Sequence, residues 1–241
     1  MRRFISQCFP RFGWQPWHSM FFGKTCRLIF LPFLVCTLLA ITAHAYQSET
    51  LMNTMDSRHG FDGRNFLNAW FDVIDRNRTK PVEEQMKAVN DFFNQRIQYS
   101  TDILIWKKSD YWATPLETMG IRAGDCEDFA IAKYVSLIEL GVPPEKLRLI
   151  YVKATIPEDV GSRIEAHMVL GYYLTPNAIP LIFDSLIPKI ESALERTDLK
   201  PVYSFNTQGL WVGNITASQA DPTARLSPWR DVLQRMQTEG F

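Results

Sequence analysis

The chain has 241 residues with 26 basic and 26 acidic side chains, but five of the basic residues and no acidic residue precede residue 46. The remainder, 46–241, therefore holds 21 basic against 26 acidic side chains, a net charge of −5. A mildly acidic chain without a basic run lacks the electrostatic footprint of a nucleic-acid-binding protein, so we expect no nucleic acid among its partners. Its length suffices for one domain with a sizeable core.

An export signal is predicted at the start of the chain. Residues 28–43 (LIFLPFLVCTLLAITA) are apolar, follow two basic residues and end in an Ala-His-Ala run. This is the order of a secretory signal peptide, and the apolar run is shorter than the ~20 residues of a typical membrane span. We expect residues 1–45 to be a signal peptide and 46–241 to be one exported domain; a retained anchoring helix is the alternative.

Two helices are predicted before the central part of the chain. Apolar residues recur at helical spacing over 62–76, and Pro81 with two following glutamates is typical of the first turn of a second helix that carries apolar residues as far as Ile97. Residues 99–109 show no regular pattern, and 110–115 read as a loop. Both helices are expected to face a core.

One cysteine remains beyond the predicted signal, because Cys8, Cys26 and Cys36 all precede residue 46. Exported proteins usually pair their cysteines, so a lone Cys126 indicates a reactive thiol, although an inert buried cysteine is the alternative. Cys126 begins an apolar stretch that predicts a central, buried helix over 126–140. At the first turn of a helix, the backbone dipole and free N–H groups favour the thiolate form.

Strands are predicted next, over 147–155, 165–173 and 179–184, with a terminal hairpin over 202–212 and a short helix from residue 227. The fold class is therefore α+β, a helical part packed on an antiparallel sheet.

The second and third of these strands predict a pair of catalytic residues. A hairpin with a four-residue loop would pair Tyr173 with Ala178, and in that register His167 lies directly opposite Asp184 on one face. A slip of one residue would separate them onto opposite faces.

These residues suit a Cys-His-Asp triad. Cys126 would be the nucleophile, His167 the base and then the acid, and Asp184 the group that holds the imidazole tautomer. The oxyanion would be held by the backbone N–H of Cys126 and a second donor. We predict the indole N–H of Trp112 for that donor, with a tryptophan that serves only the core as the alternative.

Three acidic residues crowd the predicted nucleophile, namely Asp125, Glu127 and Asp128. Nearby carboxylates raise a thiol pKa, which opposes thiolate formation. Acids are also common at helix N-termini, so a purely structural role is one interpretation. The other is a bound hard cation with oxygen ligands, most plausibly Ca²⁺, which would neutralise the cluster.

Several runs resemble the bacterial transglutaminase-like cysteine proteases: 110–117 (DYWATPLE), 124–134 (GDCEDFAIAKY) and 166–170 (AHMVL), within a similarity that extends over about 66–212. The resemblance implies a papain-like fold, a Cys-His-Asp triad on Cys126, His167 and Asp184, and a calcium requirement met partly by the acids beside the nucleophile. It further implies a periplasmic enzyme that cuts a large outer-membrane-retained adhesin near its N-terminus at a paired-alanine site and so promotes biofilm dispersal. An inner-membrane cyclic-di-GMP receptor is implied as its inhibitor.

Two other functions fit the same residues. An exported transglutaminase or amidase would use the same acyl-thioenzyme with a different acceptor. A non-enzymatic binding module would use the acidic cluster only as a calcium staple.

Overall fold

The structure is a computed structural model that describes residues 25–213 and 218–241, with side chains described from residue 47 onward. Residues group into two compact units, Met1–Ala45 and Tyr46–Phe241. Residues 1–24 of the predicted signal peptide lie outside the described part, as do the side chains of its apolar run, so the signal stays a prediction. Among the described residues, no helix combines the length and the apolar character needed to cross a bilayer.

The predicted helices are present, together with further helical segments that the sequence pattern did not predict. The described segments are α1 (Thr25–Asn77), α2 (Val82–Arg96), α3 (Asp102–Ile105), α4 (Pro115–Ile121), α5 (Cys126–Glu139), the 3₁₀ turn η1 (Pro144–Lys146), α6 (Pro222–Arg225) and α7 (Ser227–Glu239). The predicted helix over 62–76 is the last part of α1, which is interrupted at Gly60, where φ is 61°. The predicted helix over 126–140 is confirmed as α5.

The strands form two sheets. They are β1 (Gln98–Tyr99), β2 (Ala123–Gly124), β3 (Leu147–Pro157), β4 (Ser162–Tyr172), β5 (Leu181–Phe183), β6 (Glu191–Ser192), β7 (Leu199–Phe205) and β8 (Leu210–Val212). The first two pair in parallel, and the others form an antiparallel sheet in the order β6-β5-β4-β3-β7-β8. The predicted terminal hairpin is confirmed as β7 and β8.

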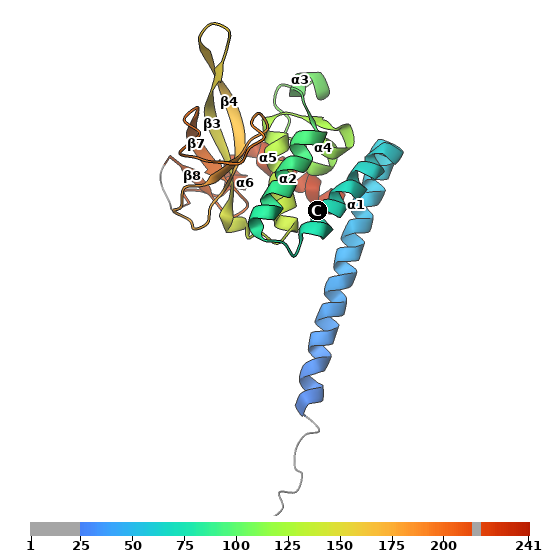
Figure 1. The fold of residues 1–241 in the computed structure, drawn as a ribbon. Helices are drawn as coiled ribbons and strands as arrows, with labels where there is room; N and C mark the ends of the chain where they lie inside the picture. The colour runs from blue at the N-terminus through green and yellow to red at the C-terminus, as the bar shows by residue number, and fades with distance from the viewer. Residues whose placement is uncertain (1–24, 214–217) are drawn as a thin grey trace, which may run out of the picture. The chain divides into compact units, whose positions relative to one another are not determined.

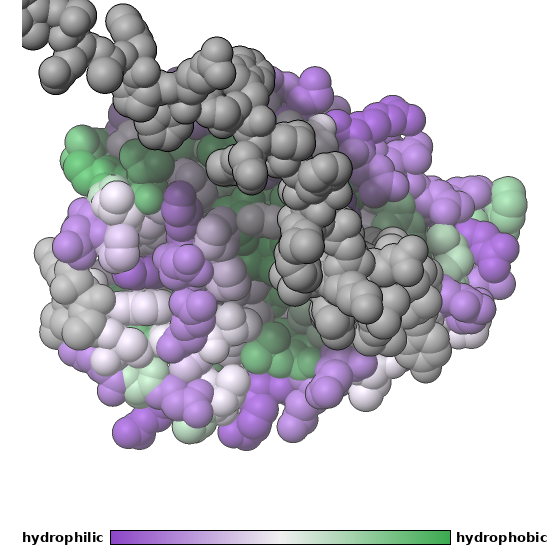
Figure 2. Space-filling view, turned by 90° about the horizontal axis from the view of Figure 1, so that it is seen from below, coloured by the Kyte–Doolittle hydropathy of each residue, from purple (hydrophilic) through white to green (hydrophobic). Residues whose placement is uncertain are grey.

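The core lies between the sheet and the helices, and α5 runs through it. In Figure 1 the sheet stands on one side of α5, with α2 and α4 on the other. Phe129, Ile131 and Leu137 of α5 are each at most 2% exposed, which explains why nearly every face of this helix is apolar. At one end of the sheet, the hairpin of β3 and β4 extends beyond the neighbouring strands (Figure 1). On the face seen in Figure 2, hydrophobic residues gather in patches among hydrophilic ones.

Helix α4 was not predicted, although its start carries a capping signal. Thr114 is the N-cap, Pro115 occupies the first turn, and the Glu117 side chain returns to the backbone N–H of Thr114 in a capping box. The run Thr-Pro-Leu-Glu therefore terminates the loop and begins a helix. Arg235 of α7 braces this turn by pairing with Glu117 and donating to the backbone carbonyl of Trp112.

The predicted register of the central hairpin is wrong by two residues. Leu170 pairs with Phe183 and Tyr172 with Leu181, so the paired numbers sum to 353 rather than 351. The connection is longer than four residues, because β4 ends at Tyr172 and β5 begins only at Leu181. A shift of two preserves the side-chain face. His167 and Asp184 therefore become diagonal neighbours on the same face instead of direct partners.

Gly124, immediately before the cysteine helix, gives the first testable prediction. A Cβ at this position would lie 2.7 Å from the Cβ and 2.8 Å from Oδ2 of Asp128. We expect Gly124→Ala to displace Asp128 and to lower the free energy of unfolding by about 1–3 kcal/mol, as overpacking does. Urea denaturation measures this loss. Ala123→Ser, in the same short strand, is the control, and equal stability of Gly124→Ala and wild type would contradict the packing argument.

Candidate active site

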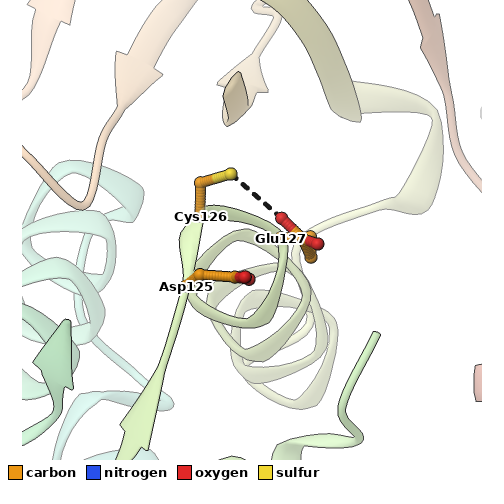
Figure 3. A group of neighbouring side chains, drawn as sticks. All are labelled: Asp125, Cys126 and Glu127. Atoms are coloured by element: carbon orange, nitrogen blue, oxygen red, sulfur yellow. Dashed lines mark hydrogen bonds between the residues drawn. The ribbon is translucent and has the colours of Figure 1, made fainter. Parts of the chain in front are cut away.

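Cys126 is the first residue of α5 and is partly buried. The segment that leads into it is held by the β1–β2 pair, in which Ser100 donates to the backbone carbonyl of Gly124 at 2.9 Å. Asp125 is the N-cap of the helix. Figure 3 shows the Cys126 and Glu127 side chains at the start of the helix, joined by a hydrogen bond, with Asp125 beside them. The predicted position at a helix N-terminus is therefore confirmed.

The surroundings of the thiol oppose its ionisation. Burial raises the pKa of Cys126, and the negative charge of Glu127, which accepts a hydrogen bond from the thiol at 2.9 Å, raises it further. Asp125 acts in the same direction, whereas the backbone N–H of Met168 on β4 favours the thiolate. The predicted conflict between nucleophile and acidic cluster is thus present in the folded chain.

His167 and Asp184 lie together, as the sequence predicted. His167 Nε2 is 2.8 Å from Asp184 Oδ1, and the two side chains are nearly fully buried. His167 directly precedes Met168, the residue whose backbone N–H contacts the Cys126 thiol. The start of α5 therefore lies against β4 at Met168, one residue after His167.

Arg196 is a residue of this site that the sequence pattern did not single out. Burial would raise the pKa of Asp184, but hydrogen bonds from His167, the backbone N–H of Leu186 and Arg196 hold it at about 2. Arg196 Nη2 is 2.7 Å from Asp184 Oδ2 and also pairs with Asp198. Asp184 is therefore an anion fixed between a histidine and an arginine. In the sequence, Arg196 was marked only by the Arg-x-Asp spacing that it forms with Asp198, twelve residues after Asp184.

The backbone of Asp184 is fixed as well. Its carbonyl accepts hydrogen bonds from Lys133 Nζ at 3.0 Å and from Asn94 Nδ2 at 2.9 Å. Lys133 is fully buried on α5 and also donates to Asn90 of α2. This network connects α5 with Asp184, the partner of His167. In the sequence, only the presence of a polar residue within the apolar helix indicated it.

Trp112 lies where its indole N–H is already engaged. Nε1 donates to Asp110 Oδ1 at 3.0 Å, and the ring stacks on Phe205 with centroids 5.7 Å apart. The side chain is 7% exposed. In this structure Trp112 therefore serves the core, which was the alternative role. The oxyanion role stays a prediction, and it requires the indole N–H to leave Asp110 and donate to the substrate.

The acidic cluster contains two residues that were not predicted as ligands. Carboxylate oxygens lie within 4.8 Å of one another in two groups, one of Asp102, Asp110 and Glu127 and one of Asp102, Asp125 and Asp128. Asp102, at the start of α3, links the two groups. Asp128 differs from the others, because its oxygens accept from the backbone N–H groups of Ala113 and Asp125. It therefore ties the loop before α4 to α5.

The cluster has the character of a cation site. Asp102 Oδ1 and Asp125 Oδ1 are buried and have no hydrogen-bond donor within the described part of the chain. Burial raises the pKa of Asp102 to about 6, and burial together with Glu127, Asp128 and Asp102 raises that of Asp125. Buried carboxylates normally have donors or counter-ions. A hard cation with oxygen ligands would supply what is missing.

Comparison with known proteins identifies the class. The model of the bacterial transglutaminase-like cysteine proteinases (BTLCP) matches residues 72–199, which is more than half of the chain and includes Cys126, His167 and Asp184. The chain belongs to this family. Its fold, a buried cysteine-bearing helix packed on an antiparallel sheet, is the predicted papain-like, transglutaminase-like fold. No curated protein matches the chain.

Among solved structures, the chain is similar to LapG of Legionella pneumophila. The EGTA-treated form is 42% identical, with a TM-score of 0.67, over 78% of this chain and 97% of that one. The calcium-bound form is also 42% identical, with a TM-score of 0.66, over 78% and 98%. The resemblance predicted from three sequence runs is confirmed: the chain is a LapG-type cysteine protease.

Proposed function

We propose that this protein is a periplasmic, calcium-dependent cysteine endopeptidase that cleaves a large surface adhesin near its N-terminus and so promotes biofilm dispersal. The observations that carry the proposal are the position of Cys126 at the start of α5, beside the backbone N–H of Met168, and the buried hydrogen bond between Asp184 and His167, the residue before Met168. Family membership supports the reaction class.

The three residues take successive roles in this proposal. His167 removes the thiol proton as Cys126 Sγ adds to the scissile carbonyl carbon. The C–N bond then breaks, His167 gives the proton to the leaving amine, and a thioester remains on Cys126. Water, deprotonated by His167, hydrolyses the thioester and restores the thiol. Asp184 stays ionised throughout and orients the imidazole, because its pKa is held at about 2.

Calcium belongs to the proposal because the acidic residues fit it. Asp102, Asp110, Asp125 and Glu127 would hold the ion, with Asp128 supporting the turn; Asp125, Glu127 and Asp128 were the predicted ligands. Each carboxylate can give Ca²⁺ one or two oxygens, and water would complete the six to eight that the ion takes. When bound, Ca²⁺ would supply positive charge that offsets Glu127 and Asp125, the two charges that raise the pKa of the thiol. The existence of a calcium-bound form of LapG supports calcium as the ion.

The substrate and the inhibitor are proposed on family membership. The substrate is an adhesin retained in the outer membrane, and an inner-membrane cyclic-di-GMP receptor is the inhibitor. A fragment of the adhesin N-terminus, incubated with the protease and analysed by mass spectrometry, tests the substrate. A cut at a paired-alanine site is expected. A fragment that stays uncut, but whose side-chain amides the protein joins to an amine or hydrolyses with release of ammonia, would favour the transglutaminase or amidase alternative.

Removal of calcium gives the second prediction. We expect EGTA to abolish cleavage and excess Ca²⁺ to restore it, with a rise in Tm of about 5–10 °C at 100-fold excess over Kd. Asp102→Asn should weaken this response, whereas Glu145→Gln, an exposed acid on η1, should not. Differential scanning fluorimetry with and without Ca²⁺ measures both. A chelator that changes neither Tm nor cleavage would remove the cation from the proposal.

The same cluster predicts a pH dependence. The pKa of Asp102 is raised to about 6, so between about pH 4 and 6 the folded, calcium-free chain holds a proton that the unfolded chain releases. In EGTA the free energy of unfolding should therefore fall as pH rises through this interval. Saturating Ca²⁺ should remove or reverse that slope, because the carboxylates are then stabilised as anions. Urea titrations at pH 5 and 7, in both conditions, measure the difference.

A further inference from the structure

A cavity lies on the face of the sheet that points away from α5. It has a volume of about 360 Å³, and its walls include Arg148, Ile150, Val169, Tyr173, Ile182 and Arg196. Side chains alternate along the strands, so Leu149 and Leu170 join the main core while Ile150 and Val169 form a separate apolar cluster on this face. Cys126 does not line this cavity, whereas Arg196, the partner of Asp184, lies at its boundary with the candidate active site.

Arg148 is the unusual residue of this cavity. It is 7% exposed, and no carboxylate of the described residues lies within ion-pair distance of its guanidinium. Nε has no acceptor there, Nη2 lies 3.5 Å from the carbonyl of Pro176, and the neutral hydroxyl of Tyr173 is the side-chain partner of the guanidinium. The guanidinium carbon lies 3.9 Å from the ring centroid of Trp211 and 4.6 Å from that of Tyr173. The cation is thus held on two aromatic faces without a counter-charge.

The other arginine of the cavity, Arg196, has the carboxylate partners that Arg148 lacks. Arg196 is 4% exposed, and Asp184 and Asp198 pair with its Nε and Nη2. Only its Nη1 lacks an acceptor among the described residues. Buried arginines are normally paired in this way, since an uncompensated buried charge is costly. Burial lowers the pKa of Arg148, and the opposing effect of Tyr173 does not cancel it.

We propose that this cavity binds an apolar carboxylate, whose anionic group pairs with Arg148 and whose apolar part contacts the Ile150, Val169 and Ile182 wall. A guanidinium without a paired carboxylate, whose Nε lacks an acceptor, matches a carboxylate ligand in charge and geometry. The volume suits a small ligand or the end of a peptide. A free carboxylic acid and a peptide C-terminus share this chemistry, and the experiment separates them.

Isothermal titration calorimetry on the full chain tests the site with two matched pairs of probes. The first pair is 4-phenylbutyrate and its amide, and the second is acetyl-Ala-Phe with a free C-terminus and with a C-terminal amide. We expect the carboxylate of at least one pair to bind about tenfold or more tightly than its amide, as a charge-assisted hydrogen bond predicts. Preference in the first pair alone identifies a free acid, and preference in the second alone a peptide terminus.

Variants then assign the preference to Arg148. Arg148→Met should abolish it, and Arg148→Lys should retain part of it, so a Met variant that fails to fold still leaves a test. Arg163→Met, on the exposed hairpin, is the control and should bind as wild type does. Equal affinity for acid and amide, no binding of any probe at about 10 mM, or a preference that survives in Arg148→Lys and Arg148→Met unchanged would overturn the proposal. None of these readouts uses proteolysis, so the result is independent of the proposed function.

Discussion

Cys126→Ser is expected to lower the rate of adhesin-fragment cleavage by at least about 10³-fold while leaving the Tm close to that of wild type. The hydroxyl is a far weaker nucleophile than a thiolate, and His167 alone cannot compensate for the lost sulfur. The substitution is nearly isosteric, and Cys126 is only partly buried, so little packing is lost. Initial rates with and without Ca²⁺, beside circular dichroism of both proteins, measure the effect.

The labelling of the thiol provides the control for this prediction. In the Tyr46–Phe241 unit Cys126 is the only cysteine, so iodoacetamide modification reports on this residue alone. The charges of Glu127 and Asp125 oppose the thiolate, and bound Ca²⁺ would offset them. We therefore expect faster labelling with Ca²⁺ than with EGTA. Substantial cleavage by Cys126→Ser would exclude this residue as the nucleophile. An unreactive thiol in both conditions would favour the non-enzymatic binding module.

Asp184→Asn is expected to lower kcat on the order of 10³-fold with little change in KM. An amide no longer holds the imidazole in the tautomer that leaves a nitrogen free for the thiol. The substitution also removes the buried anion 2.7 Å from Arg196, which we expect to cost about 3 kcal/mol and to lower the Tm by about 6–12 °C. Steady-state kinetics and thermal unfolding measure the two effects separately.

Asp198→Asn is the matched control, since Asp198 pairs with the same Arg196, and no hydrogen bond joins it to His167 in the described chain. It should lose some stability and keep most activity. The pH dependence gives a further check: the pKa of Asp184 is lowered to about 2, so its stabilisation is complete above about pH 4 and is lost as pH falls through 2. Asp184→Asn should lack this part of the acid transition. A near-normal kcat would remove Asp184 from the proposed mechanism.

Local signals predicted those parts of the molecule that depend on neighbours in the chain. Helix α5 follows from its continuous apolar stretch, and the position of Cys126 at its start follows from the glycine-containing turn before it. The β7–β8 hairpin follows from two apolar runs around a short polar link. The face shared by His167 and Asp184 was predicted correctly from strand alternation, even though the register was wrong by two residues.

Sequence alone determined the reaction class through the lone Cys126, its order relative to His167 and Asp184, and the family resemblance that these runs carry. Only the tertiary structure decided which distant groups join them. Asp102 reaches the acidic cluster from α3, and Arg196 reaches Asp184 from a loop twelve residues downstream. Such contacts depend on how elements pack rather than on spacing along the chain, because side chains that meet across a fold leave no periodic pattern in the sequence.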